Sequence, residues 1–284
     1  MRCLTGRPAA LLALAAALVG SALFGGARAE APKLHLLYEG YWGGLHAADF
    51  RITLDNPATL AKGPVGNDFR LQTRGLLDIF IKLDVDAKSR GQLVSDNPGL
   101  KVDSYHVRYR NKKRQRTIDI AFPGNDQPAR VKIHTRKFEE NTESTDTKPA
   151  DKVTEDMLVG VTDPLSAFIE ALHRVRHHLK GGTKEFTLRV YDGRRRFDVE
   201  GVYKGKTERT ILRVRHPVHH LVLSTIPVAG FRESRRVLWD GSAFDVYLTT
   251  DGRFIPLQIK SLGFGPVLNL TGECPQVCEL KRKN

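Results

Sequence analysis

The sequence predicts a mainly β protein, in which about a dozen antiparallel strands form one barrel-like or spiral sheet wrapped around a single amphipathic helix. Apolar residues alternate with period two from Leu34 onward, which is typical of strands with one buried face. One segment has helical periodicity, and a lone amphipathic helix must bury its apolar stripe against a sheet. The 284-residue chain has 40% hydrophobic and 27% charged residues, which fits a folded globular protein.

The N-terminal segment predicts export. Arginines precede an apolar core at residues 9–19, and Ala27-Arg28-Ala29 has the small-x-small pattern of a cleavage site. We therefore expect residues 1–29 to be a cleaved signal peptide and residues 30–284 to form a single β-rich domain. No stretch in the body of the chain approaches the roughly 18 apolar residues of a membrane span. The sequence thus predicts a soluble periplasmic protein.

The mature chain is basic. Removing the signal peptide takes three arginines from a net charge of +13 and leaves +10. Export argues against a nucleic-acid partner, so the charge indicates an anionic envelope surface or solubility alone. The richest basic run, Lys112 to Arg116, lies between alternating stretches at 102–110 and 118–122 and predicts a hairpin turn. Its side chains are either solvated or in contact with lipid headgroups or an anionic glycan.

Asp-Gly pairs flanked by alternating apolar residues predict hairpins with two-residue turns, and such turns fix the register. At Asp192-Gly193 the register places Arg195 opposite Val190, on an otherwise apolar face. At Asp251-Gly252, within a three-stranded meander over 235–260, it places on one face Phe244, Val246, Leu248, Ile255, Leu257 and Ile259. The first strand of that meander contributes Val237 and Trp239 to the same face.

The predicted helix has clear boundaries. Asp163 can cap it, Pro164 occupies the first helical position, and Gly181-Gly182 ends it. One apolar stripe contains Leu165, Phe168, Ile169, Leu172, Val175 and Leu179. Before the helix, residues 139–156 hold almost no large apolar side chain. They predict a polar loop, which is either a mobile flap or a disordered connection.

The two cysteines of the mature chain predict a disulfide. In an oxidising periplasm, an even pair such as Cys274 and Cys278 favours a bridge. The short spacing requires a bend, which Pro275 favours. With so short a loop, the chain-entropy model gives only about 2 kcal/mol, so the bridge would order the C-terminal end rather than hold the fold. A redox-active role is disfavoured because the Cys-x-x-Cys spacing is missing.

Motifs for metal binding or catalysis are weak. His173 and His177 have the i, i+4 spacing of a zinc helix, but Arg174 stands where His-Glu-x-x-His needs glutamate. A second histidine cluster, His216, His219 and His220, has no carboxylate close in sequence. There is no Gly-x-Ser-x-Gly elbow and no phosphate-binding loop. We therefore expect no metal, no cofactor and no enzyme, although paired glycosidase carboxylates meet only in three dimensions.

Several short motifs resemble, in this order, exported bacterial proteins of domain of unknown function 3108. They are Tyr38-x-Gly40 with Gly43-Gly44, Thr73-Arg74-Gly75-Leu76, Asp163-Pro164-Leu165-Ser166-Ala167, Tyr191-Asp192-Gly193-Arg194-Arg195, and Ile226-Pro227-Val228-Ala229-Gly230-Phe231. The resemblance covers nearly all of the mature chain and implies a periplasmic protein of Gram-negative bacteria, with no activity to transfer. Relatives often carry a cysteine within 203–215, where this chain has none, so a disulfide there is not carried over. The layout is similar to periplasmic β-wraps that carry lipids or lipoproteins, a fold-level analogy.

We expect a non-enzymatic periplasmic protein that binds an amphipathic or anionic component of the cell envelope, in the manner of a lipid carrier. The expected partner is a lipid, a lipoprotein or a glycan, with peripheral membrane contact. A structural scaffold for envelope proteins is one alternative, and a hydrolase of glycan or lipid is another. The candidate ligand-binding residues are Trp42, Asp163, Tyr191 and Arg195.

Arg195 has the most specific expectation. A charge on an apolar face cannot stay unpaired in a dry core. Three arrangements satisfy it: a position at the rim, a salt bridge to an acid such as Asp163, or contact with an anionic ligand at the mouth of the wrap.

Overall fold

The computed structural model describes residues 33–55, 63–95, 99–124, 126–150, 152–231, 242–263 and 265–280. Residues 31–284 form one compact unit. The predicted signal peptide lies outside the described residues, as does the predicted strand with Val237 and Trp239. Among the residues that are described, no helix combines the length and apolarity that crossing a membrane requires.

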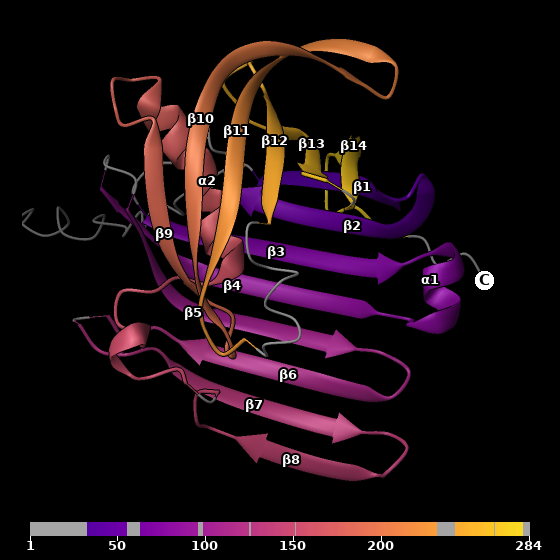
Figure 1. Cartoon of the computed structure of the whole chain (residues 1–284), viewed down its shortest axis with the longest axis vertical. Coiled ribbons are helices and arrows are strands. Elements are labelled where there is room, and N and C mark those ends of the chain that lie inside the picture. Colours follow the sequence, from indigo (N-terminus) through magenta and orange to yellow (C-terminus); the bar gives the residue numbers. More distant parts are fainter. Residues whose placement is uncertain are drawn as a thin grey trace, which may run out of the picture. The chain divides into compact units, whose positions relative to one another are not determined.

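Within the described ranges, fourteen strands form one antiparallel sheet (Figure 1). The strands are β1 (Lys33–Trp42), β2 (Leu45–Asp55), β3 (Gly63–Thr73), β4 (Asp84–Ser95), β5 (Gly99–Arg110), β6 (Arg114–Ala121), β7 (Arg130–Lys137), β8 (Thr142–Asp146), β9 (Glu185–Tyr191), β10 (Arg196–Ile211), β11 (Val214–Ala229), β12 (Ala243–Thr249), β13 (Pro256–Ser261) and β14 (Val267–Cys274). Their spatial order is β8-β7-β6-β5-β4-β3-β2-β1-β14-β13-β12-β11-β10-β9. β1 pairs with β14, while β8 and β9 are edges, so the sheet is not closed. The predicted fold class is confirmed.

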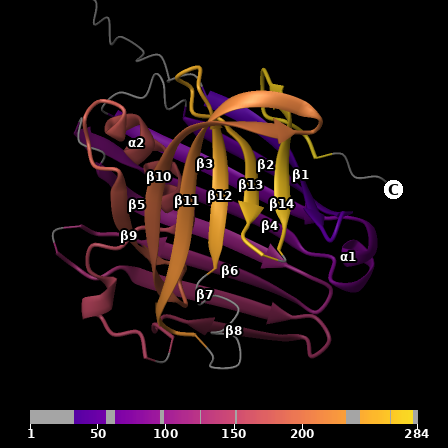
Figure 2. The same cartoon turned by 45° about the horizontal axis from the view of Figure 1, so that its top comes forward.

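The link between the two edge strands carries the predicted helix. After β8 come a 3-10 turn, η1 (Asp156–Leu158), and the helix α2 (Pro164–His178). Figures 1 and 2 show β9–β12 crossing over β3–β5, with α2 between the two layers. Three buried clusters meet on α2: Leu165 packs with β4–β7, Leu172 with β9–β12, and Ile169 with β1 and β2. The sheet is therefore folded around the helix, as the stripe predicts.

The boundaries of α2 follow the capping signals. Asp163 is fully buried, and its Oδ1 accepts hydrogen bonds from the backbone N–H groups of Leu165 (2.8 Å) and Ser166 (2.9 Å). Its Oδ2 accepts a bond of 2.8 Å from the Ser89 hydroxyl of β4. The cap therefore fastens the helix to the sheet as well as starting it. The stripe ends earlier than predicted, because Leu179 is 44% exposed.

The predicted register of the β9–β10 hairpin is wrong by two residues. Val190 pairs with Phe197, and Tyr191 pairs with Arg196, so the turn contains the four residues 192–195 instead of two. A shift of two keeps each side chain on its face, which is why the apolar face is preserved. Arg195 belongs to the turn and does not lie opposite Val190.

The β12–β13 hairpin has the same kind of error. Val246 pairs with Ile259 and Leu248 with Pro256, with an irregularity between Tyr247 and Leu248. The turn is therefore longer than the predicted Asp-Gly pair. Leu257 consequently leaves the predicted shared face and packs beside Tyr247 in a separate cluster.

Two connections contain regular structure that the sequence pattern did not predict. A short helix, α1 (Gly75–Phe80), joins β3 to β4. Within the predicted polar loop 139–156, β8 pairs with β7 and has five exposed residues, so the loop prediction is wrong there. An edge strand with no buried face needs no apolar alternation, which explains the missing signal. The predicted basic hairpin turn is present at 111–113, while Arg114 to Arg116 begin β6.

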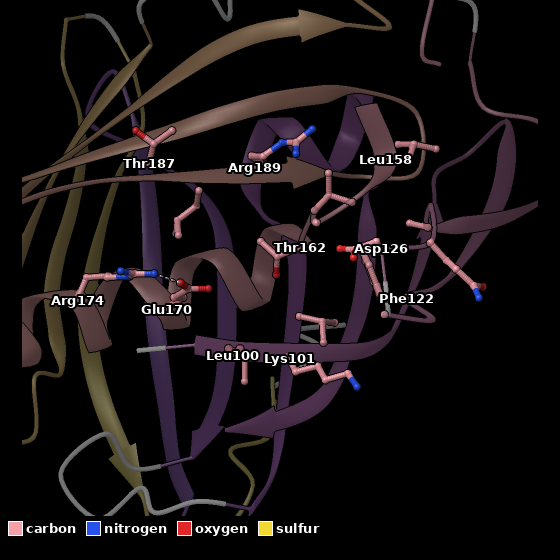
Figure 3. A pocket seen from close by; sticks show the side chains of 17 residues that line it. Leu100, Lys101, Phe122, Asp126, Leu158, Thr162, Glu170, Arg174, Thr187 and Arg189 are labelled. Carbon is pink, nitrogen blue, oxygen red and sulfur yellow. Dashed lines mark hydrogen bonds and ion pairs between the residues drawn. The ribbon is translucent and has the colours of Figure 1, made fainter. Parts of the chain in front are cut away.

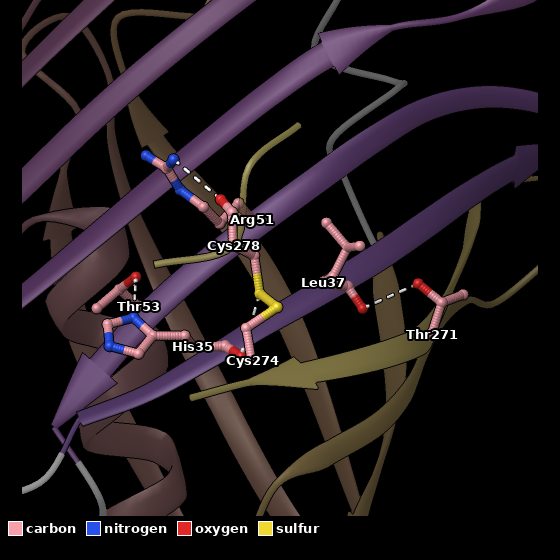
Figure 4. The surroundings of a disulfide bond; sticks show 7 residues. All are labelled: His35, Leu37, Arg51, Thr53, Thr271, Cys274 and Cys278. Carbon is pink, nitrogen blue, oxygen red and sulfur yellow. Dashed lines mark hydrogen bonds between the residues drawn. A yellow bond between two sulfur atoms is a disulfide. The ribbon is translucent and has the colours of Figure 1, made fainter. Parts of the chain in front are cut away.

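The Cys274–Cys278 disulfide is present, with 5.6 Å between the Cα atoms (Figure 4). Cys278 is buried, and its carbonyl accepts a hydrogen bond of 3.2 Å from Arg51 of β2. The Thr271 hydroxyl donates to the Leu37 carbonyl of β1 at 3.2 Å. The bridge thus lies beside the pairing of the last strand, β14, with the first, β1. This agrees with the prediction that it orders the C-terminal end.

Leu172→Ala tests the wrapping of the sheet around α2. Leu172 is fully buried, so the change should leave a cavity and lower the free energy of unfolding by about 2–5 kcal/mol. Leu179→Ala is the matched control on the same stripe, and its half-exposed side chain should cost less than about 1 kcal/mol. Urea titration followed by circular dichroism measures both. Equal costs for the two variants would contradict the placement of α2.

Candidate functional site

The tip of the β9–β10 hairpin rests on the inner face of β5–β7. Gly193 has φ +90°, and a Cβ on it would lie 2.4 Å from Cγ2 of Ile118. It would also lie 3.5 Å from side-chain atoms of Ile120 and Val131. Glycine therefore satisfies both the left-handed backbone and the close approach of the turn to the sheet.

Asp192 sets the shape of this turn. Its Oδ1 accepts hydrogen bonds from the backbone N–H groups of Arg194 (2.8 Å) and Arg195 (2.6 Å). This is the arrangement by which an aspartate side chain replaces a backbone acceptor in a turn. Burial raises the pKa of the Asp192 carboxyl, while these two hydrogen bonds and the charge of Arg195 oppose the rise. The backbone of the turn is therefore held in a defined conformation at Arg194 and Arg195.

A cavity of about 270 Å³ lies between this turn and the adjoining ends of β5 and β6. We call it the arginine pocket. Its lining includes five arginines, one carboxylate and two larger side chains at the sheet: Arg110, Arg114, Arg116, Arg194, Arg195, Asp192, Tyr109 and Ile118. Among the described lining residues, positive groups therefore outnumber negative ones by five to one.

The guanidinium groups of the arginine pocket lie close enough to affect one another. Burial, together with the positive charges of Arg194 and Arg114, lowers the pKa of Arg116 to about 10. The Arg116 Nε–H donates a hydrogen bond of 3.2 Å to the Thr135 hydroxyl, a neutral acceptor. Arg195 lies 3.8 Å from Asp192, and its guanidinium lies 5.7 Å from the centre of the Phe231 ring. Burial disfavours the charged form of Arg116, and the neighbouring guanidinium groups add to this effect.

The four candidate residues from the sequence occupy different places. Arg195 lines the arginine pocket and lies 3.8 Å from Asp192, an acid of its own turn. Asp163 caps α2 in the core, and Tyr191 is fully buried with no hydrogen-bond partner on its hydroxyl. Trp42 ends β1 and is half-exposed. The arginine pocket thus combines Arg195 with Arg114 and Arg116 of the basic run, for which contact with an anionic group was one of the two alternatives.

The sequence pattern gives only weak evidence that Arg114, Arg116 and Arg194 belong to one site. Arg114 and Arg116 were read as part of a turn, but they alternate on a strand and therefore share a face with Ile118. Arg194 lies beside Arg195 in sequence, yet its neighbours across the pocket are about 80 residues away. Only the packing of the hairpin turn on β6 brings Arg194 and Arg195 close to Arg114 and Arg116.

A second cavity, of about 510 Å³, lies at the opposite ends of β5 and β6, against α2 and β9 (Figure 3). Glu170 and Arg174 of α2 form an ion pair of 2.7 Å in its wall. Burial raises the pKa of Glu170, and the hydrogen bond from Arg174 opposes this. Asp126 lies at another side of the cavity, and the buried Thr162 hydroxyl has no hydrogen-bond partner. The cavity holds two carboxylates, although that of Glu170 is already bound by Arg174.

Three histidines of the two sequence clusters are hydrogen-bonded within the protein. His220 lies 2.7 Å from Asp245, His219 is hydrogen-bonded to Tyr203 at 2.8 Å, and His178 to the Gly182 carbonyl at 2.9 Å. Burial lowers the pKa of His173 to about 4. In the part of the chain that the structure describes, no three His, Cys, Asp or Glu side chains are grouped as metal ligands.

Gly193→Ala tests the contact that closes the arginine pocket. The added methyl group should meet Ile118 and lower the free energy of unfolding by about 2–4 kcal/mol, from backbone strain and overpacking together. Gly252→Ala is the matched control, because Gly252 has φ +85° but open space around its Cβ position. It should cost about 1 kcal/mol from strain alone. Chemical denaturation compares the two, and equal losses would show that the turn does not rest on β6.

Comparison with known proteins identifies the family. A family described as protein of unknown function (DUF3108) matches residues 37–271. A crystal structure of a β-barrel-like protein of domain of unknown function DUF1849 from Brucella abortus is similar, with a TM-score of 0.49 and 11% identity over 88% of this chain and 99% of that one. No curated protein matches the sequence. With a match that spans most of its length, the chain belongs to the DUF3108 family.

Proposed function

We propose that this protein is a non-enzymatic periplasmic protein that binds an amphipathic envelope molecule through its anionic headgroup. The observation that carries the proposal is the arginine pocket, where five guanidinium groups and one carboxylate are among the described lining residues of a single cavity. Burial, and after it the charges of Arg194 and Arg114, disfavour the charged form of Arg116, and a bound anion would favour that form.

The chemistry of the pocket selects the ligand class. A guanidinium group offers paired N–H donors that match the oxygen atoms of phosphate and carboxylate groups. Tyr109 and Ile118 add an apolar wall on the sheet side. A volume of about 270 Å³ is at the lower limit of small-molecule sites, so the pocket suits a headgroup and not a whole lipid.

The location is part of the proposal. The N-terminal pattern of arginines, apolar core and small-x-small site is that of a secretory signal. The Cys274–Cys278 disulfide fits an oxidising compartment, because such bridges are rare in the cytosol. Both features support export to the periplasm.

Two other functions have a structural feature in their favour. The edge strand β8 is exposed along its length, which would allow an envelope protein to pair with it, as a scaffold requires. A glycan or lipid hydrolase would use Glu170 and Asp126 in the larger cavity, since paired carboxylates are its catalytic groups. We favour the binding function over the hydrolase because Glu170 is already paired with Arg174, and a catalytic carboxylate would have to be available to the substrate.

Calorimetric titration with short-chain phosphatidylglycerol and phosphatidylcholine tests the binding function. The protein should bind the anionic lipid and leave the zwitterionic one unbound. Arg116→Gln combined with Arg194→Gln should weaken binding at least about 100-fold, since each charge-assisted hydrogen bond contributes about 1.5–3 kcal/mol. Arg213→Gln is the matched control, an exposed arginine in the β10–β11 turn, and should bind as the wild type does.

The alternatives predict other outcomes. Equal binding of both lipids, or an unchanged affinity in the double variant, would contradict the headgroup role of the pocket. A protein that co-purifies in stoichiometric amount and is released by substitutions in β8 would favour the scaffold. Hydrolysis that is lost in Glu170→Gln would favour the enzyme.

A further inference from the structure

Large apolar side chains are exposed together at one end of the sheet, an area we call the apolar tip. It consists of α1 with the residue after it and of the β1–β2 turn: Leu76, Ile79, Phe80, Ile81, Trp42 and Leu45. Each of these residues is between 45% and 75% exposed. Figure 1 shows α1 and the β1–β2 turn at the same end of the sheet as the turn between β5 and β6.

The apolar tip is held firmly in place. Leu76, Ile79 and Phe80 have the i, i+3, i+4 spacing that places them on one face of α1. The start of the helix is tied to β2, because the backbone N–H of Arg74 donates to the Ala47 carbonyl at 2.8 Å. The Arg74 guanidinium also pairs with Asp49 of β2 at 2.6 Å. The apolar face of α1 is thus turned outward by a fixed structure.

Positive charge surrounds the apolar tip. Lys82, Lys112 and Lys113 are exposed beside it, and the Lys112 ammonium donates to the Ile79 carbonyl at the end of α1. The nearby acids are already bound: Asp78 accepts the Thr73 hydroxyl at 2.9 Å, and Asp49 pairs with Arg74 and His46.

The outer acids of this end, which belong to the β7–β8 turn, are paired as well. Glu139 lies 4.0 Å from Lys113, and Glu140 lies 2.8 Å from Lys137. Since Glu139 balances Lys113, the positive border next to the apolar side chains consists of Lys82 and Lys112.

We propose that the apolar tip is a membrane-docking surface that inserts into the interfacial region of a bilayer containing anionic lipid. Exposed aromatic and aliphatic side chains with a basic border are the pattern of peripheral membrane binding, because apolar burial and attraction to anionic headgroups add. An exposed apolar cluster of this size on a folded protein indicates an interaction surface. Because lysine is attracted to anionic headgroups, the basic border favours a bilayer with anionic lipid over a neutral or positively charged surface.

The position of the arginine pocket fits this orientation. A cavity of about 610 Å³ lies between α1 and the β5–β6 turn and is lined by Lys82, Lys112 and Arg110. Arg110, Leu83 and Asn111 line both this cavity and the arginine pocket, so the two are neighbours. A docked protein would present the pocket close to the headgroups. The docking proposal is nevertheless separate from the binding of an anion in the pocket.

Vesicle flotation of the purified mature protein, residues 30–284, tests the docking surface. The protein should float with vesicles of phosphatidylcholine and phosphatidylglycerol and should remain unbound with phosphatidylcholine alone. Ile79→Ser combined with Phe80→Ser should lower the bound-to-free ratio at least tenfold. Circular dichroism and the thermal midpoint check that this variant is folded, since both side chains are exposed in the wild type.

The matched control removes two exposed apolar side chains from another turn. Leu212→Ser combined with Val214→Ser changes the β10–β11 tip, where these residues are 53% and 55% exposed. This variant should float as the wild type does. Lys82→Gln combined with Lys112→Gln should lower binding and make it less sensitive to salt.

Three results would overturn the docking proposal. They are equal flotation with and without phosphatidylglycerol, unchanged flotation of the Ile79 and Phe80 variant, and no flotation together with self-association that this variant abolishes. The last result would make the tip an interface between copies of the protein. Calorimetry of the same variant with short-chain phosphatidylglycerol separates the two proposals, because the arginine pocket is unaltered in it.

Discussion

The buried carboxylate of Asp163 fixes the start of α2, and the arrangement of the whole sheet depends on that helix. The carboxylate is fully buried, and burial raises its pKa while hydrogen bonds from Ser166, Ser89 and Leu165 oppose the rise. Leaving such a group without partners would cost several kcal/mol, so the bonds to α2 and β4 are required together. Since α2 contributes to three apolar clusters, the position of this cap determines how the two runs of strands fold over each other.

The basic site is a consequence of that packing. With α2 between the layers, the β9–β10 turn reaches the inner face of β5–β7, where Gly193 allows the closest approach. The contact brings Arg194 and Arg195 against Arg114 and Arg116, with Asp192 as the one acid among the described lining residues. Packing of the β9–β10 turn on the sheet thus holds several arginines close to one another in the pocket. Groups placed in this way are typical of sites where a ligand supplies the missing charge.

The sequence predicts local features better than registers. Period-two alternation and the capping residues of α2 are local signals, and the strands and the helix appear where they indicate. The first Asp-Gly register was wrong by two, and the second by two at Val246 and by one at Leu248, because the turns are longer than two residues. At 192–195 the Asp192 side chain supplies the acceptor that stabilises the longer form. The sequence did not predict α1, because the helix is only six residues long and its apolar side chains face outward instead of packing in the core.

The composition of the site was the least predictable part. Arg195 was identified for a register that does not occur, although it does line the pocket. Its partners across the pocket come from a strand about 80 residues earlier, and only tertiary packing brings them near. Trp42 was identified as a ligand contact and lies in the apolar tip, whose other members come from a helix that the alternation of residues does not reveal.

We propose that the arginine pocket binds an anion when the protein is folded. Thermal unfolding in phosphate and in chloride at equal ionic strength tests it most directly, because an anion that binds only the folded state raises its stability. Phosphate also stabilises proteins in general, so the comparison is with the Arg116→Gln, Arg194→Gln variant. We predict that the midpoint of the wild type rises more in phosphate than that of the variant. An equal rise in both proteins would contradict the account.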